Sequence, residues 1–225
     1  MDNYNYHKGM KEIIQELKVL LKTKSIGTDS DRALLLDFQA ALETQPEKAI
    51  KLEKDALAQI ENITADNARL VSNLHANLGG LYRMNGHPDL AREHMEKSIS
   101  LLDQFNLLHI NDSIPQIANY AMFLTEQQEP ERGISELQKL SGIIKEYHSD
   151  DCLDYAKVQE TLGTIYLMTA NLPQAKTHFK RAFKIYEKIW ADEPEMIEAK
   201  YQEIQELYPQ IGFCIGKNLS GLLTK

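Results

Sequence analysis

The sequence predicts an all-α protein in which about four antiparallel helical hairpins stack into a superhelix, with further helices at both ends. Three observations support this fold class. Prolines recur about every 42 residues, small residues recur at the same spacing, and the apolar residues between them are spaced by three and four. That spacing is the period of an amphipathic helix. A single hairpin cannot bury its apolar faces alone, so neighbouring hairpins must stack.

The prolines mark the starts of helices. Pro46, Pro88 and Pro130 are 42 residues apart, and Pro173 lies one residue beyond the next expected position. Proline is favoured in the first turn of a helix because its missing N–H would have no intrahelical partner there. Each proline therefore predicts the start of the second helix of a hairpin.

Small residues follow the same period at two places in each hairpin. One set lies just inside the second helix, where a wide side chain would hold neighbouring backbones apart: Ala49, Ala91, Gly133 and Ala175. The other set lies in the turn between the paired helices, where a compact residue can end the first helix: Gly86, Gln128, Ala170 and Gly212. Only Gln128 is bulky at its position.

Two hairpins carry a recognisable motif. Leu78-Gly79-x-x-Tyr82 and Leu162-Gly163-x-x-Tyr166, each followed by small and apolar residues at fixed offsets, resemble the tetratricopeptide repeat signature. The hairpins around Leu36 and Tyr120 match it less well. The period of 42 is longer than the usual repeat and resembles the kinesin light chain type. The resemblance implies a superhelix whose concave side is lined by the first helix of each pair, and it implies a role in protein–protein interaction.

We expect a single continuous domain with three parts. Residues 1–29 would form an N-terminal capping helix, residues 30–192 the four hairpins, and residues 193–225 a C-terminal capping helix with a partial fifth unit. The segment from Ile211 to Leu223 is apolar but contains three glycines. It either folds onto the last helices as a cap or docks a second copy of the chain, which would make a homodimer.

Composition disfavours several classes of partner and favours one cellular location. The net charge of −8 and pI near 5.4 disfavour nucleic acid and anionic membrane surfaces, because an acidic surface repels phosphates. Lysine and arginine are scattered, with the densest run at Lys18 to Lys24. The two cysteines stand apart, and no apolar run is long enough for a membrane span. We expect a cytoplasmic protein with no nucleic-acid and no membrane partner.

No signature of catalysis is present in the sequence. The common nucleotide-binding, zinc-protease and serine-hydrolase motifs are missing, and the seven histidines are spread over different hairpins. The segment from His148 to Cys152 holds residue types that could bind a metal ion, but it also suits a linker that caps the next helix. We therefore predict no catalytic residues, no cofactor and no metal site.

The candidate ligand groove is defined by one register position on the first helices. The period links Leu35, Asn77, Asn119 and Thr161. Because an asparagine side chain both donates and accepts, Asn77 and Asn119 could clasp successive amides of an extended peptide, as the resemblance also implies. Alternatively, they bond the neighbouring helix. The same face carries six further groove candidates: Asn73, Arg83, Met122, Lys157, Glu160 and Thr164.

This mixture of side chains suits a peptide with some acidic and some apolar residues. The favoured function is an adaptor or scaffold that binds a peptide or protein segment of a partner in the groove. One alternative is a regulatory receptor for a short signalling peptide. Another is an enzyme whose site the sequence does not reveal.

Overall fold

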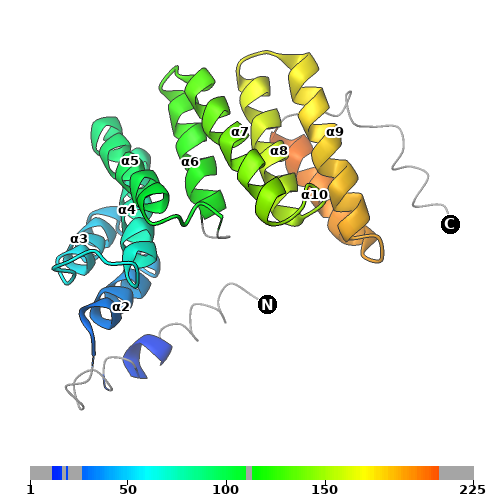
Figure 1. Ribbon diagram of the computed structural model, residues 1–225. Helices are drawn as coiled ribbons and strands as arrows, with labels where there is room; N and C mark the ends of the chain where they lie inside the picture. The colour runs from blue at the N-terminus through cyan, green and yellow to red at the C-terminus, as the bar shows by residue number, and fades with distance from the viewer. Residues whose placement is uncertain (1–11, 17–18, 20–26, 110–112, 208–225) are drawn as a thin grey trace. The chain divides into compact units, whose positions relative to one another are not determined.

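The computed structural model describes residues 12–16, 19, 27–109 and 113–207 (Figure 1). Throughout these described residues the regular structure is helical. The chain divides into two compact units, Met1–Leu108 and His109–Lys225. The expected single domain with its internal boundaries stays a prediction.

In the first unit, residues 27–108 of the described chain include two helical hairpins. Their helices are α2 (Asp29–Ala41), α3 (Pro46–Leu57), α4 (Ala68–Met84) and α5 (Pro88–Gln104). Helix α2 pairs with α3 and α4 pairs with α5, and α3 also packs against α4, so the two hairpins stack. Thr28 caps α2 with a reciprocal pair of hydrogen bonds to Asp31.

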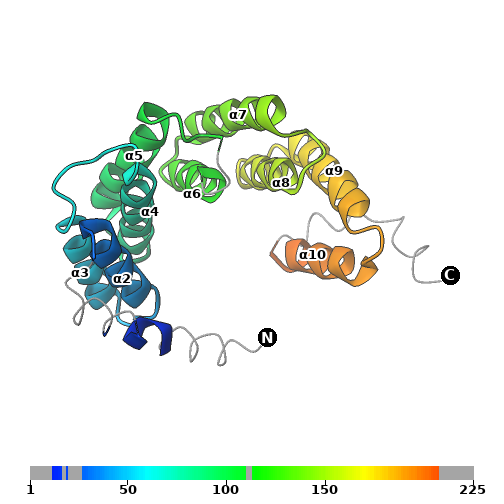
Figure 2. The same ribbon diagram turned by 60° about the horizontal axis from the view of Figure 1, so that its bottom comes forward.

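The described residues of the second unit form two hairpins and one further helix. Its helices are α6 (Ser113–Glu126), α7 (Pro130–Tyr147), α8 (Leu153–Met168), α9 (Leu172–Ile189) and α10 (Pro194–Leu207). Within this unit α6, α8 and α10 form one layer, and α7 and α9 form the layer behind it (Figure 2). Together with the first unit, this confirms the predicted all-α fold class of stacked antiparallel hairpins.

The predicted helix starts are confirmed. Pro46, Pro88 and Pro130 each occupy the first position of a helix, and Pro173 is the second residue of α9. The one-residue offset of Pro173 is therefore accommodated within the first turn, where its missing N–H costs no hydrogen bond.

The predicted turns within the hairpins are also confirmed. Gly86, Gln128 and Ala170 follow the first helices of three hairpins, with φ angles of 73°, 64° and 58°. This left-handed conformation ends a helix and favours glycine. Gln128 and Ala170 adopt it although each carries a Cβ, which costs about 1–2 kcal/mol per residue. Gly212, the fourth member of the set, lies outside the described residues.

Small residues permit the close approach of paired helices. A Cβ built on Gly133 of α7 would lie 2.6 Å from the carbonyl oxygen of Ala121 in α6. A Cβ on Gly163 of α8 would lie 2.9 Å from the ring of Phe179 in α9. Glycine at these two positions therefore sets the distance between the helices of each hairpin.

The predicted terminal segments are described only in part. Residues 12–16 are helical and Ile14 is buried, while the remainder of the expected N-terminal capping helix lies outside the described residues. The segment from Ile211 to Leu223 lies outside them as well, so the possible homodimer stays a prediction. Among the described helices, none combines the length and the apolar character needed to cross a membrane.

Candidate functional site

The predicted groove residues are distributed over both units. Asn73, Asn77 and Arg83 lie on α4 of the first unit, whereas five candidates lie on α6 and α8 of the second: Asn119, Met122, Lys157, Glu160 and Thr164. These five belong to helices of the same layer. A single groove that includes both sets stays a prediction.

The second unit holds a charged network that joins three of its helices. Glu160 of α8 accepts a hydrogen bond of 2.6 Å from the hydroxyl of Tyr186 on α9. The same carboxylate forms an ion pair of 3.0 Å with Lys200 of α10, and only 19% of each side chain in this pair is exposed. Glu203 adds a second ion pair to Lys200 at 3.1 Å. The network fastens α10 to the preceding hairpin.

The charges of this network reinforce one another. Burial works to lower the pKa of Lys200, but the carboxylates of Glu160 and Glu203 outweigh it, so that the pKa is raised. Burial, and then the neighbouring Glu160 carboxylate, raise the pKa of the Tyr186 hydroxyl. The lysine is therefore an ammonium ion and the tyrosine a neutral hydrogen-bond donor at neutral pH.

A pocket of about 270 Å³ opens beside this network. Its lining residues come from α8, α9 and α10 and from Trp190 directly after α9: Leu153, Lys157, Tyr186, Trp190, Met196, Ala199, Lys200 and Glu203. The Trp190 ring stacks on Tyr186 with centroids 4.9 Å apart and an interplanar angle of 8°. The pocket thus has an aromatic and aliphatic wall next to two lysines.

The other groove candidates of the second unit lie on α8, which lines the pocket, and on the neighbouring helix α6. Lys157 is exposed and lies 3.8 Å from Asp154, one turn away on α8. Asn119 is exposed on α6, while Met122 of α6 and Thr164 of α8 are half-buried. Helix α6 packs against α8, and a continuous face that joins these side chains stays a prediction.

In the first unit, Asn77 contacts neighbouring helices. Its side-chain amide donates to Asp37 of α2 at 2.9 Å and to Glu53 of α3 at 3.2 Å. This is the alternative that the sequence left open for the asparagine pair. Only 2% of Glu53 is exposed, and its second carboxylate oxygen has no hydrogen-bond partner. Asn73 and Arg83, on the same helix, are half-buried.

The pKa values of both carboxyl groups beside Asn77 are raised. Burial is the main cause that raises the pKa of Glu53 to about 9, and the adjacent Asp37 carboxylate adds to it. Burial likewise raises the pKa of Asp37. Like charges this close cannot both ionise in a desolvated position. Asn77 therefore stabilises the stack of α2, α3 and α4, whatever else it binds.

Sequence reasoning missed several residues of the second unit. Tyr186, Trp190 and Lys200 belong to the network or the pocket, but only the stacking of hairpins brings them to Glu160.

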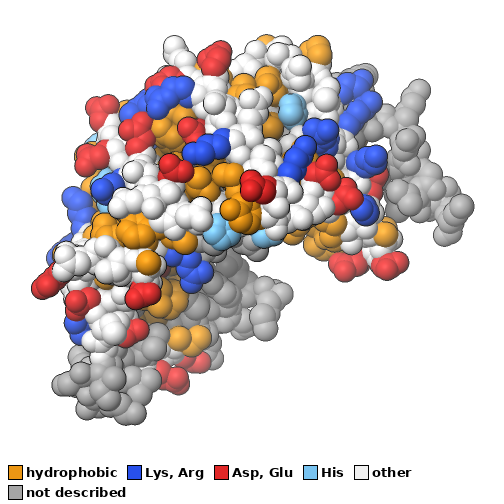
Figure 3. Space-filling model, in the orientation of Figure 1, with side chains coloured by type: hydrophobic (Ala, Val, Ile, Leu, Met, Phe, Trp, Pro, Cys, Tyr) orange, Lys and Arg blue, Asp and Glu red, His pale blue; other side chains and the backbone are white. Residues whose placement is uncertain are grey.

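Sequence reasoning also missed a basic face on α9. Figure 3 shows lysine and arginine side chains gathered over α9. Four exposed lysines recur there at every fourth position, the helical period: Lys176, Lys180, Lys184 and Lys188.

Metal-ligand residues do not cluster densely in the described part of the chain. No group of three or more histidine, cysteine, aspartate or glutamate side chains lies close enough there to hold a metal ion. His148 instead contacts the backbone carbonyl of His109, and Cys152 caps α8 by accepting from the backbone N–H of Tyr155.

Comparison with known proteins identifies the repeats. Residues 113–188 match the family model for the tetratricopeptide repeat. No curated protein matches the chain in sequence. Solved structures of low sequence identity share its fold, and at such identities the likeness concerns the fold alone.

Three of these structures are informative. BtubC (BKLC) from P. vanneervenii has a TM-score of 0.66 and 19% identity, over 81% of this chain and 72% of that one. Kinesin light chain-type repeats from Podospora anserina have a TM-score of 0.67 and 14% identity, over 84% and 92%. MamA has a TM-score of 0.55 and 16% identity, over 84% and 96%.

Proposed function

Residues 113–188 belong to the tetratricopeptide repeat family and the chain has its fold, and on this premise we propose that the protein binds a segment of a partner protein. The segment lies on the face formed by α6, α8 and α10. The observation that carries the proposal is the pocket beside Trp190 and Lys200, which opens next to residues that the repeat register had already selected.

The size of the pocket favours a side chain over a free small molecule. Pockets for drug-sized ligands have volumes of about 300–1,000 Å³, whereas this one has about 270 Å³. It therefore suits one apolar side chain of a longer chain that continues along the face. The stacked rings of Tyr186 and Trp190 supply a rigid apolar wall for such an anchor.

Charged side chains around the pocket favour particular residues next to the apolar side chain of the partner segment. Lys157 is exposed at the rim and Lys200 is held in place by its two carboxylates. An acidic residue of the segment would pair with the Lys157 ammonium, while the exposed amide of Asn119 would bond the backbone of the segment. We therefore propose a partner segment in which an apolar residue lies next to an acidic one. The role is one of binding, as in an adaptor or scaffold.

The test begins with selection of ligands. The full chain is panned against a displayed library of random peptides, and each selected peptide is then titrated against variants. Lys157→Ala and Asn119→Ala remove exposed side chains and should leave helicity unchanged. We expect each to weaken binding about 5- to 10-fold, the equivalent of about 1–1.4 kcal/mol. Lys176→Ala on α9 is the matched control and should bind normally.

The choice of variants follows from the structure. Asn77→Ala would break two hydrogen bonds that hold the first unit together, so weaker binding by that variant would not separate recognition from stability. Asn119 lacks this complication because, among the described residues, its side chain makes no such hydrogen bond to another helix. Selected peptides that bind Lys157→Ala and Asn119→Ala as tightly as the unaltered chain would refute the proposed site.

A further inference from the structure

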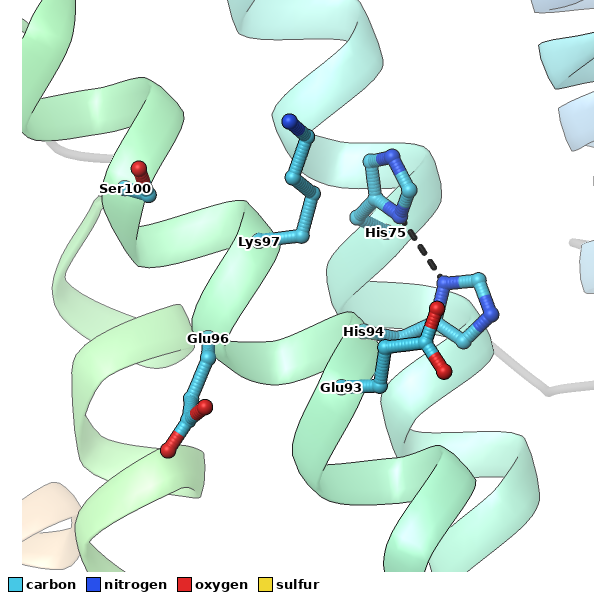
Figure 4. Close-up of a pocket in the computed structure, with 6 residues that line it drawn as sticks. All are labelled: His75, Glu93, His94, Glu96, Lys97 and Ser100. Carbon is cyan, nitrogen blue, oxygen red and sulfur yellow. Dashed lines mark hydrogen bonds between the residues drawn. The ribbon is translucent and has the colours of Figure 1, made fainter.

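Two histidines meet at the interface of α4 and α5 in the first unit. The Nδ1 atoms of His75 and His94 are 2.8 Å apart (Figure 4). They lie at one side of a pocket of about 460 Å³, whose other lining residues belong to α5: Glu93, Glu96, Lys97 and Ser100. The ring of His94 also stacks on Tyr82, with centroids 5.4 Å apart.

The hairpin formed by α8 and α9 repeats this arrangement with one change. Two periods further along the chain, Tyr166 and His178 replace Tyr82 and His94, and their rings stack with centroids 5.3 Å apart. The residue that replaces His75 there is Gln159. Its Oε1 lies 2.9 Å from the Nδ1 of His178. The same backbone frame thus holds a His–His pair in one hairpin and a His–Gln pair in the other.

The second hairpin shows which of these side chains the fold itself requires. Glutamine satisfies the ring nitrogen of His178, so the frame needs a hydrogen-bonding side chain at that position but not an imidazole. At the neighbouring position Glu93 is replaced by Thr177, whose hydroxyl donates to the carbonyl oxygen of Pro173 within α9. The first unit therefore has a second imidazole and a carboxylate that the repeated frame does not require.

We propose that His75 and His94 form a binding site for one divalent transition-metal ion of the class that prefers imidazole ligands, such as Zn²⁺ or Cu²⁺. Both Nδ1 atoms coordinate the ion, and water from the pocket completes its coordination. Figure 4 shows the Glu93 carboxylate beside His94, where its negative charge favours a bound cation.

The distance between the two nitrogens is compatible with this role. Metal–nitrogen bonds of about 2.0–2.1 Å separate two ligand nitrogens by roughly 2.9 Å at a right angle and roughly 3.3 Å at the tetrahedral angle. The observed 2.8 Å therefore requires the rings to move apart by no more than about half an ångström. Small rotations of two half-buried side chains allow this.

The protonation state of the pair also permits binding. Burial lowers the pKa of His75 to about 4 and lowers that of His94 as well. Both rings are consequently neutral at pH 7, as metal binding requires. In the metal-free pair one Nδ1 donates its proton to the other. On binding, that Nδ1 proton leaves for solvent while the same ring takes up one proton from solvent at Nε2, so no net proton is released.

Isothermal titration of the full chain with Zn²⁺, and separately with Cu²⁺, tests the proposal. His75→Gln recreates the pair seen between Gln159 and His178, so it should fold normally while its affinity for the ion falls at least tenfold. His178→Gln is the matched control and should bind one ion per chain as the unaltered protein does. The nitrogen NMR signals of the His75 and His94 rings should shift on addition of Zn²⁺.

Two results would overturn the inference. One is the absence of saturable binding by the unaltered chain at pH 7. The other is affinity of folded His75→Gln within twofold of the unaltered chain, because this would assign the ion to other residues. Circular dichroism of the variant establishes in either case that the hairpin is intact.

Discussion

Replacing Glu53 with glutamine should remove a pH-dependent loss of stability from the first unit. Burial and the adjacent Asp37 raise the pKa of Glu53 from 4.5 to about 9. A pKa raised in the folded state means that the protonated carboxyl stabilises the fold. This stabilisation is fully present below pH 4.5 and is lost progressively as the pH rises through about 9.

The expected magnitude follows from linkage. One group that titrates in this way lowers the free energy of unfolding by up to about 1.4 kcal/mol for each pH unit within that window. Between pH 6 and pH 8 the unaltered protein should lose about 2–3 kcal/mol through this group. Glutamine has the shape of a neutral glutamic acid and cannot ionise, so its amide can donate to Asp37 at every pH.

Urea unfolding followed by far-ultraviolet circular dichroism at pH 6, 7 and 8 measures the effect. Because other groups titrate in the same range, the informative quantity is the difference between variant and unaltered chain at each pH. That difference should increase by about 2–3 kcal/mol from pH 6 to pH 8 in favour of Glu53→Gln. Hydrogen exchange of α3 should show the same trend locally.

Two further variants complete this test. Asp37→Asn should flatten the pH dependence only in part, because it removes the neighbouring charge but leaves Glu53 buried. Glu61→Gln alters an exposed carboxyl in the loop after α3 and should leave the pH dependence unchanged. If the difference between Glu53→Gln and the unaltered chain stays constant from pH 6 to pH 8, Glu53 is not protonated in the folded protein and the reasoning is wrong.

Predictions for four substitutions concern the free energy of unfolding of the second unit, measured by urea unfolding. Gly133→Ala should lower the free energy of unfolding by about 1–3 kcal/mol, because its Cβ would meet a carbonyl oxygen of α6 at 2.6 Å. Gly142→Ala on the same helix meets open space and should instead gain about 0.5–1 kcal/mol; equal effects would contradict the packing argument. Ala170→Gly should raise the free energy of unfolding by up to about 1 kcal/mol, because glycine adopts a positive φ without strain. A lower free energy of unfolding would contradict the strain argument. Tyr186→Phe removes a hydrogen bond to a carboxylate and should cost about 1–2 kcal/mol, whereas an unchanged midpoint would show that the network contributes nothing.

Local features of the fold could be predicted from the sequence because they depend on single residues. A proline at the start of a helix lacks a hydrogen bond that would be missing there in any case, so Pro46, Pro88 and Pro130 mark their helices without help from the rest of the chain. The turn positions Gly86 and Ala170 follow equally from the period, since the left-handed end of a helix is a local conformation. Their recurrence every 42 residues then indicated that the hairpins stack.

The site was predicted less completely, because the position of a residue in the repeat identifies the helix face that it lies on but not the side chains that it contacts. The period placed Asn77 and Asn119 at equivalent positions and both are exposed, yet among the described residues only Asn77 bonds carboxyl groups of other helices. The difference arises because Asp37 and Glu53 are specific to the first unit. A one-dimensional pattern carries no information about such neighbours.

By itself, the sequence determined the helices, their ends and their repeated pairing, because these depend on local conformation and on the spacing of apolar residues. Only the tertiary structure decided which side chains meet. Glu160 and Lys200 are 40 residues apart, and the lysine reaches the carboxylate only after α9 has packed behind α8 and turned the chain back. Likewise, His75 and His94 face each other because α4 and α5 pack antiparallel, at a rotation about their axes that the core sets.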